Sequence, residues 1–290
     1  MNTYKYLLLA FCLIATACDT YKQDDYTPEY VVESYLIAGE PLPVVKLSQT
    51  STINAQYRFE DYAVDGASVM VTLLDDAGQV EETFRYGPGE RGVYVPFVGH
   101  EVLPLRRYGL QVQPPEGGER ITASTLVPEM FFIDELDVNT ITYQEGEALA
   151  FDMSQSTYPG RSAIYINKVE AVDTSYALTP LYQDLVEDGE VTKEDLIDNS
   201  SGILNEANFQ PASEDMLTVI VPWIGIAFYG PNNLVVDAID DNVFDFVRSI
   251  EENGVRPLGE RENVIDHVEG GRGIFGSLAR ARVQIFVSQE

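Results

Sequence analysis

The chain has 290 residues, of which 45% are hydrophobic and 11% aromatic, so it contains enough apolar side chains to bury a core and is not a disordered protein. Its 47 Asp and Glu residues outnumber its 18 Lys and Arg residues, which gives a formal net charge of -29. Such a surface repels phosphate groups. We therefore expect no nucleic-acid partner and no electrostatic attraction to an anionic bilayer.

The N-terminus has the features of a bacterial export signal. An apolar stretch, Leu7 to Ala17, is too short to span a bilayer of about 30 Å as a helix. Cys18 directly follows small residues, as lipoprotein processing requires, although Ala15 and Ala17 also fit cleavage by the general signal peptidase. We predict that residues 1–17 are removed as a signal peptide and that a lipid on Cys18 holds the mature chain to a membrane.

Residues 18–29 are polar and are predicted to form a tether. The tether contains a charged run made of Lys22, Gln23, Asp24 and Asp25. This run resembles the acidic signal that directs Bacteroidetes lipoproteins to the outer surface, and a generic charged linker is the alternative. The only other cysteine, Cys12, lies in the signal, so no disulfide is expected in the mature chain.

Residues 30–128 show the pattern of an immunoglobulin-like β-sandwich, because short apolar segments alternate with turn residues about every 8 to 12 positions. The predicted strands are Val31 to Ala38, Val44 to Ser48, Ala67 to Leu74, Val80 to Tyr86, Val93 to Val98, Tyr108 to Gln113 and Ile121 to Leu126. Pro128 marks the predicted boundary, since the strand periodicity pauses there.

Residues 129–290 are predicted to form a second β-rich domain with helical insertions. Its predicted strands are Ala148 to Asp152, Ala163 to Val172, Met216 to Val221, Asn233 to Val236 and Arg282 to Val287. The helix-favouring stretches are Leu181 to Asp188 and Thr192 to Asp198. A clearer helix contains Val243, Phe246, Val247 and Ile250 on one face, with Asp241 as the predicted N-cap and Gly254 available to end it.

Four segments carry a resemblance to a known family: Val31 to Thr50, Ala63 to Gly78, Val235 to Phe246 and Gly270 to Ala279. They resemble a Bacteroidetes lipoprotein family that is catalogued only as a domain of unknown function, and the resemblance covers nearly the whole mature chain in order. It implies an outer-membrane lipoprotein, commonly encoded beside TonB-dependent receptors, with an immunoglobulin-like N-terminal part. It implies no catalytic residues.

No motif in the sequence predicts catalysis. The two histidines, His100 and His267, are far apart, and neither belongs to a His-Glu-x-x-His zinc motif. Gly276-Ser277 does not continue into a nucleophile elbow, and the glycine-rich stretch Gly270 to Gly273 lacks the Lys-Ser/Thr of a phosphate-binding loop, so it predicts a tight turn before the last strand. We expect a protein that is not an enzyme and carries no cofactor.

Two groups of residues are candidate binding sites. The densest set of oxygen ligands, which calcium prefers, comprises Asp237, Asp240, Asp241, Asn242 and Asp245, although EF-hand spacing is absent and Asp240 and Asp241 equally suit a helix start. The aromatic candidates for partner binding are Tyr57, Phe59, Tyr62, Trp223, Phe228 and Tyr229, for which burial in the core is the alternative.

The predicted function is that of an accessory lipoprotein that is anchored to the outer membrane, faces the cell exterior and acts with a TonB-dependent receptor or its ligand. One alternative is a surface glycan-processing hydrolase, because catalytic carboxylates meet in space and the many acids single out no pair. The other alternative is a structural lipoprotein that faces the periplasm.

Overall fold

The computed structural model describes residues 26–52, 55–134, 140–255 and 264–289. Strands make up 47% of the structure and helices 15%, which confirms the prediction of a mainly β protein. The predicted signal peptide, the lipidation site Cys18 and the run Lys22 to Asp25 lie outside the described residues. None of the described helices has both the length and the apolar character needed to cross a membrane.

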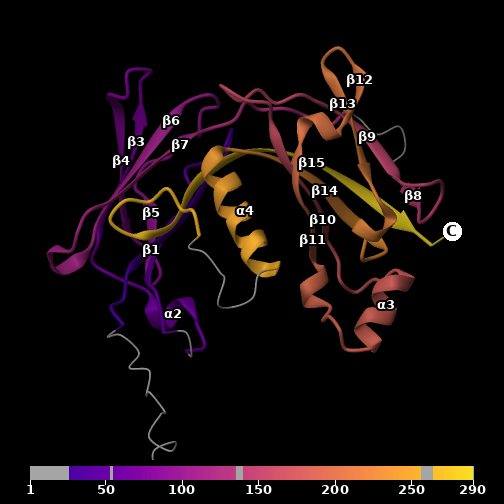
Figure 1. Ribbon diagram of the computed structural model, residues 1–290, viewed down its shortest axis with the longest axis horizontal. Coiled ribbons are helices and arrows are strands. Elements are labelled where there is room, and N and C mark those ends of the chain that lie inside the picture. The colour runs from indigo at the N-terminus through magenta and orange to yellow at the C-terminus, as the bar shows by residue number, and fades with distance from the viewer. Residues whose placement is uncertain (1–25, 53–54, 135–139, 256–263, 290) are drawn as a thin grey trace, which may run out of the picture.

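The first half of the chain folds into seven strands with short helical turns between them (Figure 1). The elements are β1 (Tyr30–Ile37), β2 (Val45–Gln49), α2 (Phe59–Tyr62), β3 (Ser68–Leu74), β4 (Val80–Pro88), β5 (Val93–Pro96), β6 (Arg107–Gln113), η1 (Pro115–Gly117) and β7 (Ile121–Leu126). All seven strands coincide with predicted segments, because one face of each strand is buried and the sequence alternates accordingly. The immunoglobulin-like topology stays a prediction.

The second half is less regular and ends in a long strand. Its elements are β8 (Thr140–Thr142), β9 (Leu149–Ser154), β10 (Ile164–Ala171), α3 (Pro180–Glu187), η2 (Glu194–Leu196), β11 (Asp198–Asn205), η3 (Glu206–Asn208), β12 (Gln210–Ser213), β13 (Met216–Val221), η4 (Trp223–Gly225), β14 (Gly230–Ile239), α4 (Asp241–Val255) and β15 (Arg272–Ser288). The prediction that the last strand starts at Arg282 is therefore wrong, since β15 begins at Arg272.

β15 joins the two halves through one continuous sheet. Its first part, residues 272–278, pairs in parallel with residues 31–37 of β1, and its second part pairs antiparallel with β14. The large sheet has 12 strands in the order β11-β10-β14-β15-β1-β2-β5-β4-β3-β6-β7, with β8 beside β15, while β12, β13 and β9 form a separate sheet. Figure 1 shows β15 in yellow crossing from one half to the other behind α4. The boundary predicted at residue 128 stays a prediction.

The main core lies between the faces of these sheets in both halves. Its fully buried members include Phe84 and Tyr108 in the first half and Tyr165, Met153 and Phe275 toward the second. A smaller cluster lies on the opposite face of the large sheet, where Ile166, Ile239 and Ile274 pack against α4. Burial of these apolar side chains supplies the main driving force for folding.

Helix α4 begins at Asp241, and Asp240 rather than Asp241 is its cap. The backbone N–H of Val243 donates to Asp240 Oδ1 at 2.8 Å, and the N–H of Phe244 donates to the Asp240 carbonyl at 3.0 Å. A capping side chain accepts a hydrogen bond from a backbone N–H two or three positions later in the chain. Asp240, the residue directly before the first helical residue, does this. Gly254 does not end the helix, which continues to Val255.

Candidate functional site

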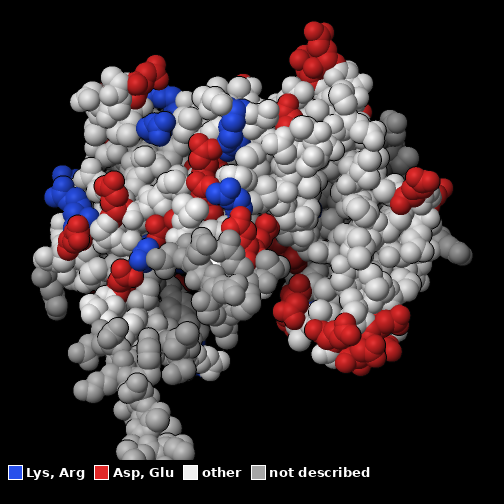
Figure 2. Space-filling view, in the orientation of Figure 1, with Lys and Arg blue, Asp and Glu red and all other residues white. Residues whose placement is uncertain are grey.

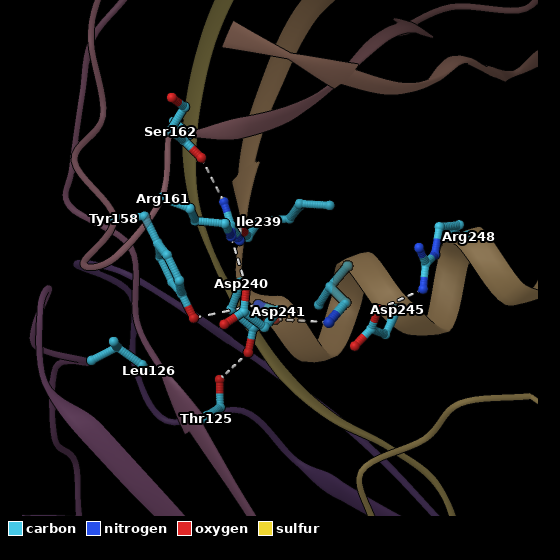
Figure 3. Close-up of polar contacts among 12 residues, drawn as sticks. Thr125, Leu126, Tyr158, Arg161, Ser162, Ile239, Asp240, Asp241, Asp245 and Arg248 are labelled. Carbon is cyan, nitrogen blue, oxygen red and sulfur yellow. Dashed lines mark hydrogen bonds and ion pairs between the residues drawn. The ribbon is translucent and has the colours of Figure 1, made fainter.

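A buried network of polar side chains lies where α4 begins (Figure 3). Thr125 of β7 donates a hydrogen bond from Oγ1 to Asp240 Oδ2, and the same hydroxyl lies 2.6 Å from Ser277 Oγ of β15. Ser277 Oγ donates in turn to the carbonyl of Leu126 at 3.0 Å. Only 1% of Asp240 is exposed, and Ser277 is fully buried. The network therefore ties α4 to β7 of the first half and to β15, the last strand of the chain.

Burial raises the pKa of Asp240 to about 6, and the negative charge of Asp241 adds to this shift, although the hydrogen bonds from Thr125 and from the backbone N–H of Val243 oppose it. Burial therefore outweighs the hydrogen bonds of the network and favours the neutral acid.

The remaining acids of the calcium hypothesis are paired with separate basic residues, and Asp245 lies 3.2 Å from the Arg248 guanidinium. Asp237, which is 2% exposed, receives two hydrogen bonds from the Arg280 guanidinium at 2.6 and 2.8 Å and lies 3.3 Å from Lys168 Nζ. Asp241 pairs with Arg161 at 2.7 Å. Within the described part of the chain, no three His, Cys, Asp or Glu side chains are grouped so that they could hold a metal ion. The structure does not bring the predicted ligands together.

A polar cleft of about 780 Å³ lies beside the start of α4, over the outer face of β3, β6 and β7. Its charged and titratable lining residues are Arg107, Asp241, Asp266, His267 and Glu269. His267 Nε2 lies 2.8 Å from Asp245 Oδ2. Among the described residues, no serine hydroxyl has a hydrogen bond to His267, so the histidine lacks the nucleophile of a Ser-His-Asp site.

His100 has a packing role. Its Nε2 lies 2.9 Å from the hydroxyl of Tyr108, and its ring centroid lies 4.3 Å from that of Phe84. Both of these neighbours are buried. His100 is therefore held by packing against Phe84 and by its contact with the Tyr108 hydroxyl.

The structure divides the aromatic candidates into two groups. Tyr57 is half exposed and stacks on Tyr62 with centroids 5.4 Å apart, whereas Phe59 is partly covered by Lys46. The second group is packed. Trp223 and Phe228 are buried, Trp223 donates from its indole N–H to the carbonyl of Gly146 at 3.2 Å, and Tyr229 meets Tyr143 edge to face. Of the two groups, only the one around Tyr57 offers an aromatic surface to a partner.

Three loops at one end of the first half expose several large apolar side chains. We call residues 38–44, 97–106 and 127–132 the distal loops. Backbone hydrogen bonds join them, from Gly39 N to Val102 O at 2.8 Å and from Leu105 N to Val127 O at 2.9 Å. Their exposed large apolar residues are Val44, Phe97, Val98, Leu103, Leu105, Met130 and Phe132, and Phe97 is 68% exposed. Apolar side chains gathered in this way are typical of interaction sites.

Comparison with known proteins places the chain in a family. A sequence model described as "Domain of unknown function (DUF4249)" matches residues 19–284. The chain belongs to this family. No curated protein matches it.

Solved structures resemble this DUF4249 chain only loosely. Trypsin-activated alpha-2-macroglobulin from Escherichia coli is 9% identical, with a TM-score of 0.26, and the match covers 90% of this chain and 16% of that protein. The three N-terminal domains of the outer capsid protein Hoc of bacteriophage RB49 are 8% identical, with a TM-score of 0.21, over 88% of this chain and 70% of that one. These likenesses support no inference about function.

The distal loops of the DUF4249 chain were not predicted as a site. Phe97 and Val98 fall in the predicted strand Val93 to Val98, but β5 ends at Pro96 and leaves both side chains in a loop. Hydropathy identifies apolar residues, but it does not tell which of them the fold leaves exposed. Only a predicted strand end at Pro96 would have indicated from the sequence that Phe97 and Val98 lie in a loop.

Proposed function

We propose that this DUF4249 protein is an accessory lipoprotein that is anchored to the outer membrane through Cys18, faces the cell exterior and binds a protein partner with its distal loops. The partner that fits the resemblance described above is a TonB-dependent receptor. The apolar character of the loops supports a protein surface as the ligand, because exposed apolar side chains gain most from contacts that exclude water.

The position of the distal loops relative to the chain's start carries the proposal. β1 begins at Tyr30, directly after the predicted tether, and runs for eight residues to Ile37, a length of about 26 Å for an extended strand. The first distal loop follows at residue 38. A chain tethered before Tyr30 therefore carries these loops on the end that points away from its anchor.

The test is affinity purification of the tagged protein from solubilised membranes. The double variant Phe97→Ser, Met130→Ser removes apolar surface from the distal loops, and Ile250→Ser on α4 is the matched control because Ile250 is similarly exposed. We expect the native chain and the control to recover the same envelope protein, and we expect the double variant to lose it. Equal recovery by all three proteins would contradict the proposal.

The polar cleft is the observation that favours a second candidate, a surface glycan-processing hydrolase. Asp241, Asp266 and Glu269 all line it, and paired carboxylates are what glycoside hydrolysis needs. Asp241 and Asp266 each lie within 4 Å of an arginine, which leaves Glu269 as the acid to change. Release of reducing sugar from surface glycans by the purified protein, lost in Glu269→Gln, would favour the hydrolase over the accessory protein.

The orientation in the membrane has its own test. Protease added to intact cells should cut the protein if it faces outward, as we propose. A chain that stays uncut until the outer membrane is opened would support the periplasm-facing alternative.

A further inference from the structure

A second cleft lies in the other half of the molecule, between β10 and β11 on one side and β13 and η4 on the other. We call it the side cleft. Its volume is about 490 Å³, within the range of about 300–1,000 Å³ that is usual for small-molecule sites. No residue of the distal loops lines it. Its walls are apolar and are formed by Val169, Leu204, Ile220, Val221, Pro222 and Ile224.

Hydrogen bonds hold one side of the side cleft in shape. The hydroxyl of Tyr182, on α3, donates to the carbonyl of Ile224 at 2.6 Å, and Asn199 Nδ2 donates to Tyr182 Oη at 2.9 Å and to the carbonyl of Gly225 at 3.0 Å. These polar groups are already paired within the protein. Ile220 and Ile224 nevertheless remain about half exposed. The cleft is therefore preformed and presents apolar surface to solvent.

One polar group in the side cleft has no partner. Asn167 lines the cleft and is 7% exposed, and its Oδ1 is buried without a hydrogen-bond partner among the described residues. It lies where the pairing of β10 with β11 shifts, and its backbone N–H donates to Ser201 Oγ at 3.0 Å. Buried polar atoms almost always have a partner, and a half-turn of the Asn167 amide, which exchanges its oxygen and nitrogen, would present Oδ1 to an N–H or O–H from outside the chain.

Charges around the side cleft favour a neutral ligand. Lys168 is the only charged residue in its lining, and the Lys168 ammonium is paired with Asp237. Figure 2 shows acidic side chains gathered over α3, which supplies Tyr182 to the cleft. The exposed acids there are Asp184, Glu187, Asp188 and Glu190. This field repels an anion, while the cleft holds no unpaired acid to attract a cation.

From these observations we infer that the side cleft binds a neutral, mainly apolar small molecule that carries one hydrogen-bond donor. The apolar body lies against Ile220 and Ile224, and the donor satisfies Asn167. This site is independent of the distal loops, so its failure would leave the proposed partner binding intact.

The test uses N-phenyl-1-naphthylamine, a neutral apolar amine with one N–H donor whose fluorescence rises in apolar sites. It is titrated into the mature chain, residues 18–290, with Cys18→Ser to prevent lipidation. We expect saturable binding at one site. The anionic analogue 8-anilino-1-naphthalenesulfonate should bind more weakly, and the N-methylated amine, which has no donor, should bind about tenfold more weakly because one hydrogen bond is lost.

Variants locate the probe. Ile224→Asn should weaken binding, whereas Ile250→Asn, which changes an exposed isoleucine on α4, should leave it unchanged. Asn167→Leu should lower the affinity for the N–H amine to that for its methylated form and should not lower the midpoint of thermal unfolding, since no protein hydrogen bond of the side chain is lost. Unsaturable fluorescence, equal binding to Ile224→Asn, or equal affinities for the two amines would overturn the inference.

Discussion

Replacement of Asp240 by asparagine should change how the stability of the fold depends on pH. The pKa of Asp240 is raised from 3.8 to about 6 in the folded protein, chiefly by burial. Between these two values the folded state binds more protons than the unfolded state, so the free energy of unfolding falls as the pH rises. At about 1.4 kcal/mol per pKa unit, ionised Asp240 destabilises the fold by about 3 kcal/mol above pH 6 relative to pH below 4.

Asp240→Asn removes the titration but keeps the geometry. The amide oxygen can still accept the hydrogen bond from the N–H of Val243, and the amide N–H₂ can donate to Thr125 as the protonated acid would. The free energy of unfolding is measured by urea titration at pH 4, 5, 6 and 7. We expect the variant to gain about 2 kcal/mol relative to the native protein between pH 4 and pH 7, because Asp240 of the unfolded chain is already more than half ionised at pH 4.

Asp241→Asn is the matched control because the neighbouring carboxyl is largely exposed and pairs with Arg161. The difference in the free energy of unfolding between Asp241→Asn and the native protein should change little over the same pH range, since exposed ion pairs contribute about 1 kcal/mol or less. The reasoning about Asp240 would be refuted by a parallel pH dependence of the native protein and Asp240→Asn, which would mean that Asp240 keeps its ordinary pKa in the folded state.

Three further predictions concern the anchor, a buried ion pair and a backbone contact. Cys18→Ser should abolish incorporation of labelled palmitate and release the protein from the membrane fraction. Asp237→Ala should destabilise the fold by about 3 kcal/mol in urea titration, because it leaves the Arg280 guanidinium without its carboxylate. Gly273→Ala should prevent folding as judged by circular dichroism, since the φ of Gly273 is +109° and a Cβ there would lie 2.0 Å from a backbone oxygen. Gly117 has φ +75° and open space around it, so Gly117→Ala should lower the free energy of unfolding by only about 1 kcal/mol.

Strands with one exposed face could be predicted from the sequence, and the long last strand could not. β3 alternates buried and exposed positions at its start, and its turn at residues 75–78 is marked by Asp and Gly. In β15 six consecutive residues, Ile274 to Ala279, are buried because α4 covers one face and the core covers the other. Alternation disappears in such a segment, and its glycines favour the prediction of a turn.

The polar network at α4 was beyond prediction for a different reason. Asp240 was identified as a helix-start residue, and it is one. Thr125 lies 115 positions before Asp240 in the chain, and Ser277 lies 152 positions after Thr125. Neither Thr125 nor Ser277 belongs to a motif. Hydroxyl residues of this kind are common on strands, so only the fold tells which of them meet a buried carboxylate.

The same topology explains how a single tether can hold both halves. β1, the first strand after the predicted anchor, lies between β2 and β15 and is hydrogen-bonded on both sides. A force applied through the tether acts along β1, so its bonds to both neighbours must be sheared together and cannot be opened one at a time. β15 carries that load across to β14 in the second half. The first distal loop and the β10–β11 wall of the side cleft are thus carried by one sheet, in which β1 is the strand that follows the predicted anchor.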